Sequence, residues 1–284
     1  MNSSQFKRSE FKRLCNIIRV SPERVKYILS NLDNFYRVKV EGKADKKTGN
    51  LKRYKDGAIK TRIINPPNLE LKTIQRKINK YILSPIELPI IVHGGRIGKS
   101  NISNAKVHQG KRYILATDLQ DFYPSISYNK VYETLQSFNF SPHFSYWLTK
   151  LITYKYKVPQ GAPTSTNISN LVFYQTDLKL ISLCKVNNIT YTRYIDDLTF
   201  SSQHDFSHLI NDILETIKSA GFNISYRKTQ YEGKQSITGI NVFPHKIDAP
   251  LNIIEKSKIE LALNEPDKPY TLYRNSILKT NKKK

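Results

Sequence analysis

An α+β fold is predicted by three features of this 284-residue sequence. Short runs rich in β-branched and aromatic residues alternate along the chain with segments whose apolar residues recur at helical spacing. No Gly-rich dinucleotide fingerprint accompanies this alternation, and an α+β architecture follows. With 39% hydrophobic residues, the chain is long enough to bury a substantial core, in one large domain or in two small lobes.

The N-terminal third contains two predicted helices and a pair of predicted strands. Ser21 and Pro22 offer a favourable N-cap and first residue for the first of these helices. Residues 33–65 predict two strands joined by a long basic loop at 43–57. Asn68 can cap the next helix, whose apolar stripe faces inward. Its basic flank consists of Lys72, Arg76, Lys77 and Lys80.

The remaining elements are predicted from periodicity and from breakers. A helical region covers roughly 129–151, another helix begins at Thr166, and an amphipathic helix ends at Gly221, a C-cap. Short strand-like pieces occupy 222–243. The last ~40 residues are weakly patterned and end in the tail Lys282–Lys284, which we expect to be frayed.

The charge of the chain indicates a polyanionic partner. Lys and Arg number 46 against 23 Asp and Glu, a net charge of +23. Nucleic acid is the default partner, because cationic side chains release counterions from phosphates, and an anionic membrane surface is the weaker alternative. No run approaches the ~20 apolar residues of a membrane span, and the N-terminus has no signal-peptide stretch. Two cysteines are too few for a disulfide framework or zinc site. We expect a soluble, cytoplasmic protein.

Two acidic sites stand out against this basic background. Asp118 ends an apolar strand, and Asp196 with Asp197 sits between two strand runs, where a hairpin would present both at its tip. Adjacent carboxylates are tolerated most easily where a cation neutralises them. Together with substrate phosphates they suit Mg²⁺, and two such ions can catalyse in-line phosphoryl transfer. The alternative is ordinary turn chemistry, which the apolar residues flanking the hairpin argue against.

The same residues carry a resemblance to reverse transcriptases. YIDD at 194–197 resembles their Y-x-D-D signature, and DLQDFYPSI at 118–126 resembles their first palm motif. Further matches occur in the correct order over roughly residues 55–243, which makes the combined signal strong. They are KTRII at 60–64, PQGAPTST at 159–166, Lys228-Thr229 and ITG at 237–239. Thr166 departs from the family, which usually has Pro there.

Within that family the chain is similar to the bacterial retron-type enzymes. Asn104-Ala105-x-x-His108 resembles their N-A-x-x-H element, and ITG is close to their V-T-G. The resemblance implies a right-hand polymerase with fingers and palm and a short thumb-like C-terminal segment. The corresponding domains would be N-terminal helices and fingers at 1–110, a palm at 111–243, and a thumb-like segment with a basic tail at 244–284.

The resemblance also implies roles for the acidic residues. Asp118 and Asp196 would be direct ligands of two Mg²⁺ ions, for which Mn²⁺ could substitute, with the Leu119 carbonyl and Asp197 beside them. Lys228 could protonate the departing pyrophosphate or screen its charge.

Nucleotide and RNA contacts are implied in the same way. Tyr123 matches an aromatic gate that would exclude a ribose 2′-OH; otherwise it is a core tyrosine. Gln160 and Gly161 would line the nucleotide pocket, and Lys60 and Arg62 would bind the triphosphate, although a solvated basic face is the alternative for both. The RNA-linked residues of the retron element are Asn104 and His108, which four-residue spacing would place on one helix face; local hydrogen bonding is the competing interpretation.

The leading functional hypothesis is a retron-type RNA-directed DNA polymerase, a nucleotidyltransferase. By resemblance it would use dNTPs to copy a dedicated structured non-coding RNA into a small RNA-linked DNA, act in bacterial antiphage defence with a separate effector protein, and need no membrane. The alternatives are another bacterial defence-associated or group II intron-like reverse transcriptase, or a catalytically retired RNA-binding protein. A basic membrane-surface protein is disfavoured because no long basic amphipathic helix is present.

Overall fold

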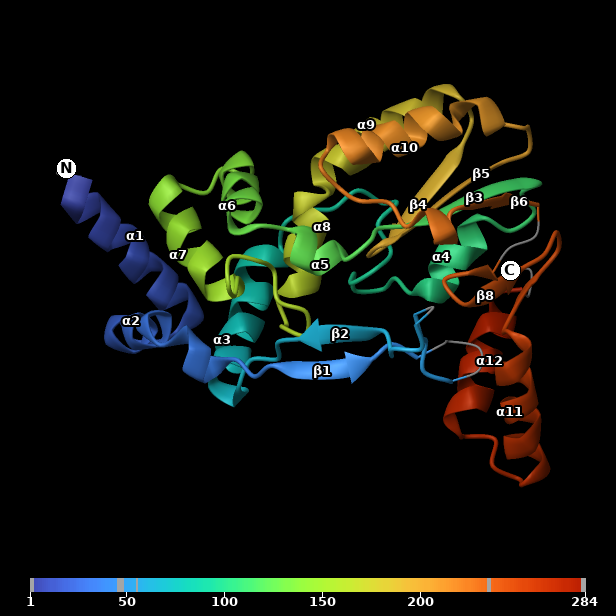
Figure 1. The fold of residues 1–284 in the computed structure, drawn as a ribbon, viewed down its shortest axis with the longest axis horizontal. Coiled ribbons are helices and arrows are strands. Elements are labelled where there is room, and N and C mark those ends of the chain that lie inside the picture. The colour runs from blue at the N-terminus through green and yellow to red at the C-terminus, as the bar shows by residue number, and fades with distance from the viewer. Residues whose placement is uncertain (1–2, 45–48, 55, 234–235, 282–284) are drawn as a thin grey trace. The chain divides into compact units, whose positions relative to one another are not determined.

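The computed structural model describes residues 3–44, 49–54, 56–233 and 236–281, and Figure 1 shows them as helices and strands. The chain divides into two compact units, each built from two separate segments. The first unit combines Met1–Leu88 with Asp121–Phe173, and the second combines Pro89–Gln120 with Tyr174–Lys284. The predicted α+β class is confirmed, because helices and antiparallel sheets occur together. The domains at 1–110, 111–243 and 244–284 remain a prediction.

The first unit is mainly helical and carries one two-stranded sheet. As predicted, Ser21 caps its second helix and Asn68 caps the helix after the strands, each through its side-chain oxygen. The antiparallel strands pair Lys39 with Ile64 at one end of the ladder. The elements are α1 (Ser3–Ile18), α2 (Pro22–Ser30), β1 (Lys39–Gly42), β2 (Thr61–Ile64), α3 (Leu69–Ile78), a π-helical turn (Asn79–Leu83), α5 (Phe122–Ser125), α6 (Tyr128–Ser137), α7 (Pro142–Ile152), α8 (Ser165–Val172) and a 3₁₀ turn (Leu32–Phe35).

The second unit is organised around a four-stranded antiparallel sheet in the order β4-β5-β3-β6. Helix α9 and helix α10 lie together along one side of this sheet (Figure 1). The elements are α4 (Asn101–Val107), β3 (Tyr113–Asp118), α9 (Tyr174–Val186), β4 (Thr190–Tyr194), β5 (Asp197–Ser202), α10 (Ile210–Ser219), β6 (Gln230–Glu232), β7 (Ser236–Ile237), β8 (Ile240–Val242), β9 (Ile247–Asp248), α11 (Leu251–Ala262), α12 (Pro269–Lys279) and 3₁₀ turns at Ser207–Leu209 and Tyr226–Lys228.

The predicted helical region at 129–151 and the helix predicted from Thr166 each consist of two helices in the structure. The region 129–151 contains α6 and α7, because Ser141 caps a new helix that begins at Pro142. The helix predicted from Thr166 is divided at Phe173, which caps α8 and separates it from α9. Parts of the predicted loop 43–57 and the tail Lys282–Lys284 lie outside the described residues.

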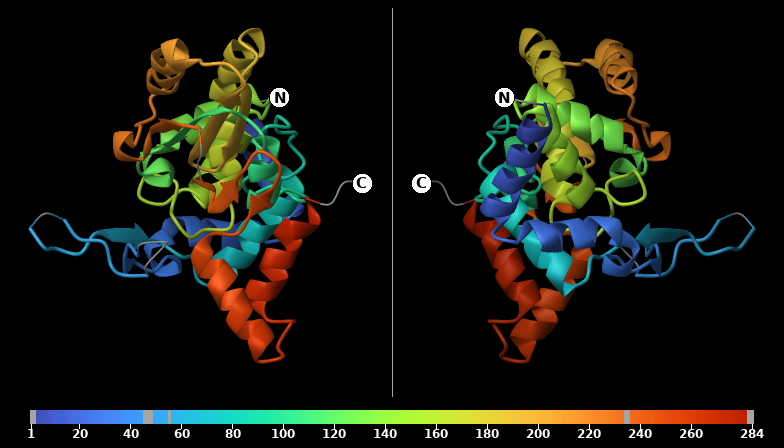
Figure 2. Two further views of the ribbon diagram at one scale, coloured as in Figure 1. Left: turned by 90° about the vertical axis from the view of Figure 1, so that its right-hand side faces the viewer. Right: turned by 90° about the vertical axis from the view of Figure 1, so that its left-hand side faces the viewer.

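The weakly patterned C-terminal residues form two helices, α11 and α12, which lie side by side in Figure 2. Their contact is largely polar: the Thr271 backbone N–H and hydroxyl both donate to the Glu260 carboxylate, at 2.7 and 2.8 Å. Apolar residues such as Leu251 and Leu263 stay exposed. A helix pair joined by polar side chains has no continuous apolar stripe, which explains the weak sequence signal.

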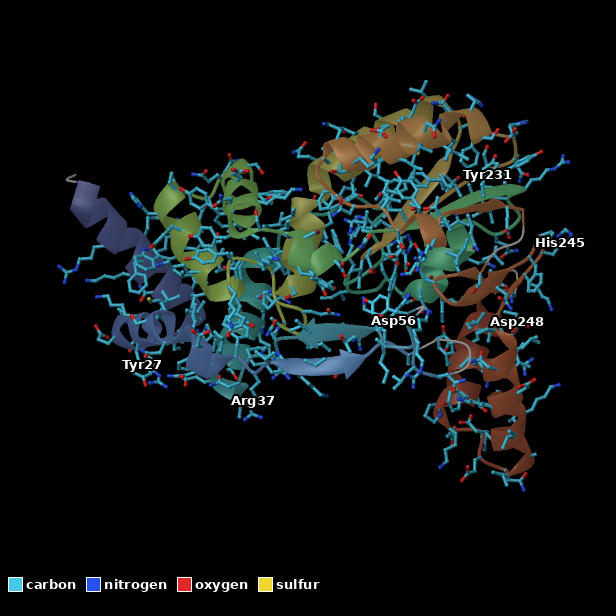
Figure 3. The ribbon with its side chains drawn as sticks, viewed as in Figure 1. Tyr27, Arg37, Asp56, Tyr231, His245 and Asp248 are labelled. Atoms are coloured by element: carbon cyan, nitrogen blue, oxygen red, sulfur yellow. The ribbon has the colours of Figure 1, made fainter. Side chains whose placement is uncertain are left out.

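Ile277 is the residue of helix α12 that is buried in the core of the second unit. This side chain is fully buried in an apolar cluster with residues of α4, β3, β7, β8 and β9. Asp248, labelled in Figure 3, adds a weaker contact, since its Oδ1 lies 3.9 Å from Nε of Arg274 on the same helix. Among the residues that the structure describes, no helix has the length and apolar character needed to cross a membrane.

We expect Ile277→Ala to lower the free energy of unfolding of the second unit by about 2–5 kcal/mol, because the substitution leaves a cavity in a closed core. Urea denaturation followed by tyrosine fluorescence and circular dichroism measures the change. The matched control on the same helix is Leu272→Ala, where the side chain is 48% exposed; its effect should stay within about 0.5 kcal/mol. Equal effects of the two variants would show that α12 is not docked through Ile277.

Candidate active site

Strand register places two carboxylates directly opposite each other in the second unit. Asp118, the last residue of β3, is the cross-strand partner of Asp197, the first residue of β5. Direct partners share one face of a sheet, so both side chains point to the same side. Asp118 is only 7% exposed. The predicted strand end and the predicted hairpin therefore meet, and they bring together the three acidic residues of the sequence analysis.

Asp196 lies in the tight turn of the β4–β5 hairpin, which has only two residues between its strands. The backbone N–H of Leu119 donates to the Asp196 carbonyl at 2.9 Å, so the turn is tied to the end of β3. The other turn residue, Ile195, has φ of +62°. A positive φ is expected at this place in the hairpin, where Gly is usual, and it is costly for a β-branched residue.

Lys228 neutralises part of this acidic cluster. Its Nζ lies 2.7 Å from Oδ2 of Asp118, although the lysine side chain is 59% exposed. Partial burial would lower the lysine pKa, but the hydrogen bond to Asp118 and the charges of Asp118, Asp197 and Asp196 outweigh it, and the pKa of Lys228 is raised. The ammonium group therefore stays protonated well above neutral pH.

The donor types fit a hard divalent cation, since Asp118 and Asp197 are cross-strand partners and Asp196 lies in the adjoining turn. Within the described part of the chain, no group of three His, Cys, Asp or Glu side chains is already arranged as a metal site. One oxygen of Asp118 accepts a hydrogen bond from Lys228.

A separate hollow of about 510 Å³ lies within the first unit. Three cationic side chains line it, Arg62 from β2 with Lys72 and Arg76 from α3, and no carboxylate is among the lining residues. Such a hollow has the charge expected for an anionic, phosphate-bearing ligand. The remaining lining residues are Ile64, Tyr123, Gln160, Gly161, Ala162, Pro163, Ser165 and Thr166.

Gly161 is required where the loop 159–166 approaches β2. Its φ is +102°, and an added β-carbon would lie 2.7 Å from Cγ2 of Ile64. The preceding residue, Gln160, accepts a hydrogen bond at its carbonyl from the Asn65 N–H at 2.8 Å. Predicted pocket residues from two distant motifs, 60–64 and 159–166, are thus brought together.

Tyr123, the predicted aromatic gate, lines the same hollow and is half-buried. Its hydroxyl lies 3.1 Å from Oγ1 of Thr166, within hydrogen-bonding distance. Thr166 occupies the position where the resemblance leads one to expect Pro. The departure from the family motif therefore supplies a hydroxyl partner for the tyrosine, which a proline could not do.

Of the two residues predicted to bind the triphosphate, one lines the hollow and the other does not. Arg62 lines the hollow and donates to Oε2 of Glu41 at 3.0 Å. Lys60 is not among the lining residues; its Nζ lies 5.0 Å from the ring centre of Tyr54. Lys72 and Arg76 belong to the basic flank predicted for this helix, and their place in the hollow is not predicted from the sequence. Their i, i+4 spacing on α3, next to the arginine-bearing strand, was the signal that they share a face with it.

Asn104, in the middle of α4, and His108, at its C-cap, are both fully buried. The two ring nitrogens of His108 lie 2.7 Å from the Ser201 hydroxyl and 2.6 Å from the Thr192 hydroxyl, so the ring bridges β5 and β4. Asn104 Nδ2 lies 3.5 Å from Oγ1 of Thr238, within the ITG segment. As placed, these side chains contact protein rather than solvent, which agrees with the local hydrogen-bonding interpretation.

Comparison with known proteins matches residues 46–242 to the family "Reverse transcriptase (RNA-dependent DNA polymerase)". The chain is 37% identical over 194 residues to the retron Se72 reverse transcriptase of Salmonella heidelberg (strain 579083-10), covering 64% of this chain and 51% of the relative. It is 31% identical over 241 residues to the retron Ec86 reverse transcriptase of Escherichia coli, covering 81% of this chain and 70% of that relative.

Among solved structures, telomerase from Candida albicans in complex with a fragment of telomeric RNA is similar in fold. The TM-score is 0.52 at 12% identity, over 81% of this chain and 50% of the telomerase chain. At that identity the likeness concerns the fold alone. The chain thus spans about half the length of the Se72 relative and of the telomerase chain.

The buried histidines predict a loss of stability in acid. Burial is the largest cause lowering the pKa of His108 to about 3 and of His93 to about 4. The unfolded chain binds these protons below about pH 6.5 and the folded chain does not, so stability falls as the pH drops from there. His108→Gln should make that fall shallower, by up to roughly 1.4 kcal/mol per pH unit for the proton removed.

Urea titrations between pH 7 and 4.5 measure this slope. The control is His208→Gln, since His208 is exposed on the second unit. An unchanged slope in the His108 variant would contradict a buried, neutral imidazole.

Proposed function

Since the chain belongs to the reverse transcriptase family, and within it to the bacterial retron-type enzymes, we propose that it is an RNA-directed DNA polymerase that extends a primer 3′-OH on an RNA template. The observation that best supports this is the pairing of Asp118 with Asp197 across β3 and β5, next to Asp196 in the turn. Two-metal phosphoryl transfer uses carboxylates held in this way, on strand ends and the turn beside them.

In this proposal Asp118 and Asp196, with the Leu119 carbonyl, hold Mg²⁺, and Asp197 supports the same site. The metal, when bound, supplies activation of the attacking hydroxyl and stabilisation of the leaving oxygen. Before it binds, Lys228 offsets the mutual repulsion of the carboxylates through its 2.7 Å contact with Asp118. Once released from that contact, its protonated Nζ can donate to the departing pyrophosphate.

The hollow of the first unit would bind the triphosphate of a dNTP. Arg62, Lys72 and Arg76 line it, and guanidinium groups pair well with phosphate oxygens because they donate in a planar fork. For Lys60, a role in nucleotide binding is supported only by the resemblance of the motif at 60–64 to the family. Gln160 and Gly161 would border the base pair, with Gly161 allowing the close approach of loop and strand.

Tyr123 would act as the gate against ribonucleotides. The contact with Thr166 supports this, because a hydroxyl anchor limits the rotamers of the ring. The ring would then occupy the space that a ribose 2′-OH requires.

We further propose that Asn104 and His108 serve the RNA indirectly. His108 bridges the two strands of the acidic hairpin, and Asn104 holds Thr238 of the ITG segment. The RNA would be a structured non-coding transcript that supplies template and primer, yielding a small RNA-linked DNA. Antiphage defence, a separate effector protein and a cytoplasmic location belong to the same proposal.

Replacing Asp196 and Asp197 by Asn should reduce dNTP incorporation at least about 1000-fold, because the residues that hold the metal act as a unit. RNA affinity should change less than about threefold, since the cationic surface is untouched. Primer extension and filter binding at fixed salt measure the two properties. Asp212→Asn, an exposed acid on α10, is the control. Retained incorporation would refute the assignment of Asp196 and Asp197 to the metal site, absence of incorporation by the parent protein would refute the polymerase assignment, and lost RNA binding would argue against a purely catalytic role.

Tyr123→Ala should lower discrimination against ribonucleotides by about 100-fold, since the space for the 2′-OH opens. Thr166→Val and Tyr123→Phe each remove only the hydroxyl contact and should lower it by no more than about tenfold. Single-nucleotide incorporation with dNTP and rNTP gives the ratio. If all three variants keep the parental ratio, Tyr123 is not the gate.

A further inference from the structure

A fully buried ion pair links the acidic hairpin to helix α9. Arg193 on β4 and Asp177 on α9 are both 0% exposed, and their Nη2 and Oδ2 atoms lie 2.6 Å apart. Nε of the arginine donates to the same carboxylate at 2.9 Å. A desolvated pair contributes little net stability compared with apolar residues of similar volume. A role of the pair in fixing local conformation therefore explains its presence better than a gain in stability does.

The arginine connects that carboxylate to the turn. Its remaining terminal nitrogen, Nη1, donates to the Ile195 carbonyl at 3.0 Å. The guanidinium group is planar and rigid, so fixing two of its nitrogens on Asp177 also fixes the direction of the third. The position of the Ile195 carbonyl is thereby tied to helix α9.

Ile195 needs such a restraint because its backbone is strained. It is a β-branched residue at φ of +62°, a region that residues of this shape rarely occupy. Conformations of this kind persist only where the surroundings determine them. Ile195 directly precedes Asp196 and Asp197, so relaxation of its backbone would redirect both carboxylates.

Gly94 confines the same residue from another side. A β-carbon at Gly94 would overlap the Ile195 backbone nitrogen and lie 2.6 Å from its Cγ1 and 2.9 Å from the Tyr194 carbonyl carbon. The segment before Gly94 is bonded to β4, since Arg193 N–H donates to Ile91 and His93 N–H donates to the Arg193 carbonyl. The glycine is thus held against the turn by backbone hydrogen bonds.

We propose that Arg193, oriented by Asp177, is the positioning residue of the acidic turn, and that it works together with Gly94 to keep Ile195 left-handed and Asp196 and Asp197 aimed at the metal. This inference rests on the proposed function, because it assumes that these carboxylates bind a divalent cation. Neither Arg193 nor Asp177 contacts the metal or substrate in this scheme.

Mn²⁺ binding followed by electron paramagnetic resonance tests the proposal on the full chain without turnover. Arg193→Lys keeps the charge and the contact with Asp177 but cannot span to Ile195. Its Mn²⁺ affinity should fall about 10-fold or more, as for other groups that orient metal ligands. Hydrogen exchange of the peptide covering 190–202 should quicken at the turn while the β4–β5 ladder stays protected.

Two matched variants separate positioning from general stability. Tyr191→Phe removes another buried hydrogen bond to Asp177, of 2.8 Å, but leaves the link to Ile195 and should bind Mn²⁺ like the parent. Ile195→Gly removes the strain, so adding it to Arg193→Lys should restore affinity to within about threefold of the parent. Failure of that rescue, or equal losses in the Tyr191 and Arg193 variants, would overturn the proposal.

If Arg193→Lys does not fold, Gly94→Ala tests the proposal in a protein whose ion pair is intact. The added methyl group would press on Ile195 and weaken Mn²⁺ binding as the arginine variant does; unchanged binding contradicts the proposal. Asp118→Asn distinguishes failure of the positioning role from failure of the proposed function. If it abolishes Mn²⁺ binding while the Arg193 variant is unaffected, the site stands and the positioning role fails. If parental Mn²⁺ binding is indifferent to Asp118, the proposed function itself fails.

Discussion

The register between β3 and β5 is the constraint on which the candidate active site depends. It sets Asp118 against Asp197, a like-charge pair at a position where opposite charges would stabilise the sheet. A slip of one residue would send one of these carboxylates to the opposite face. The sheet therefore maintains an unfavourable pair at its end, and Lys228 supplies the compensating charge.

Several elements of the second unit brace this strand end. The Leu119 N–H holds the turn, Ser225 N–H donates to the Asp118 carbonyl at 2.8 Å, and His108 ties both hairpin strands to α4. On β6, Tyr231, labelled in Figure 3, lies 2.5 Å from a carboxylate oxygen of Asp205 and accepts from the Phe206 N–H. Most of these bonds join groups far apart in sequence. Such bonds restrict motion of the sheet, which suits a site whose ligands must stay in place.

Sequence reasoning succeeded where local chemistry decides the structure and failed where tertiary contacts do. The caps Ser21 and Asn68, the end of β3 at Asp118 and the hairpin around Asp196 follow from residue types at fixed spacing. The break at Phe173 and the polar α11–α12 pair have no such local signature. Strand alternation put Lys60 beside Arg62, yet the actual companions of Arg62 come from α3 through packing. The burial of His108 likewise required the sheet it bridges.

The discontinuous make-up of the two units has a consequence for synthesis on the ribosome. Strand β3 is internal in its sheet, and both neighbours, β5 and β6, follow it far along the chain. The first unit also closes only after its second segment, Asp121–Phe173, has emerged. At about 5–20 residues per second, the apolar run Tyr113–Asp118 waits for seconds with both edges open. An open apolar strand is prone to pairing with other chains, so nascent molecules arrested between β3 and β5 expose a strand that can aggregate.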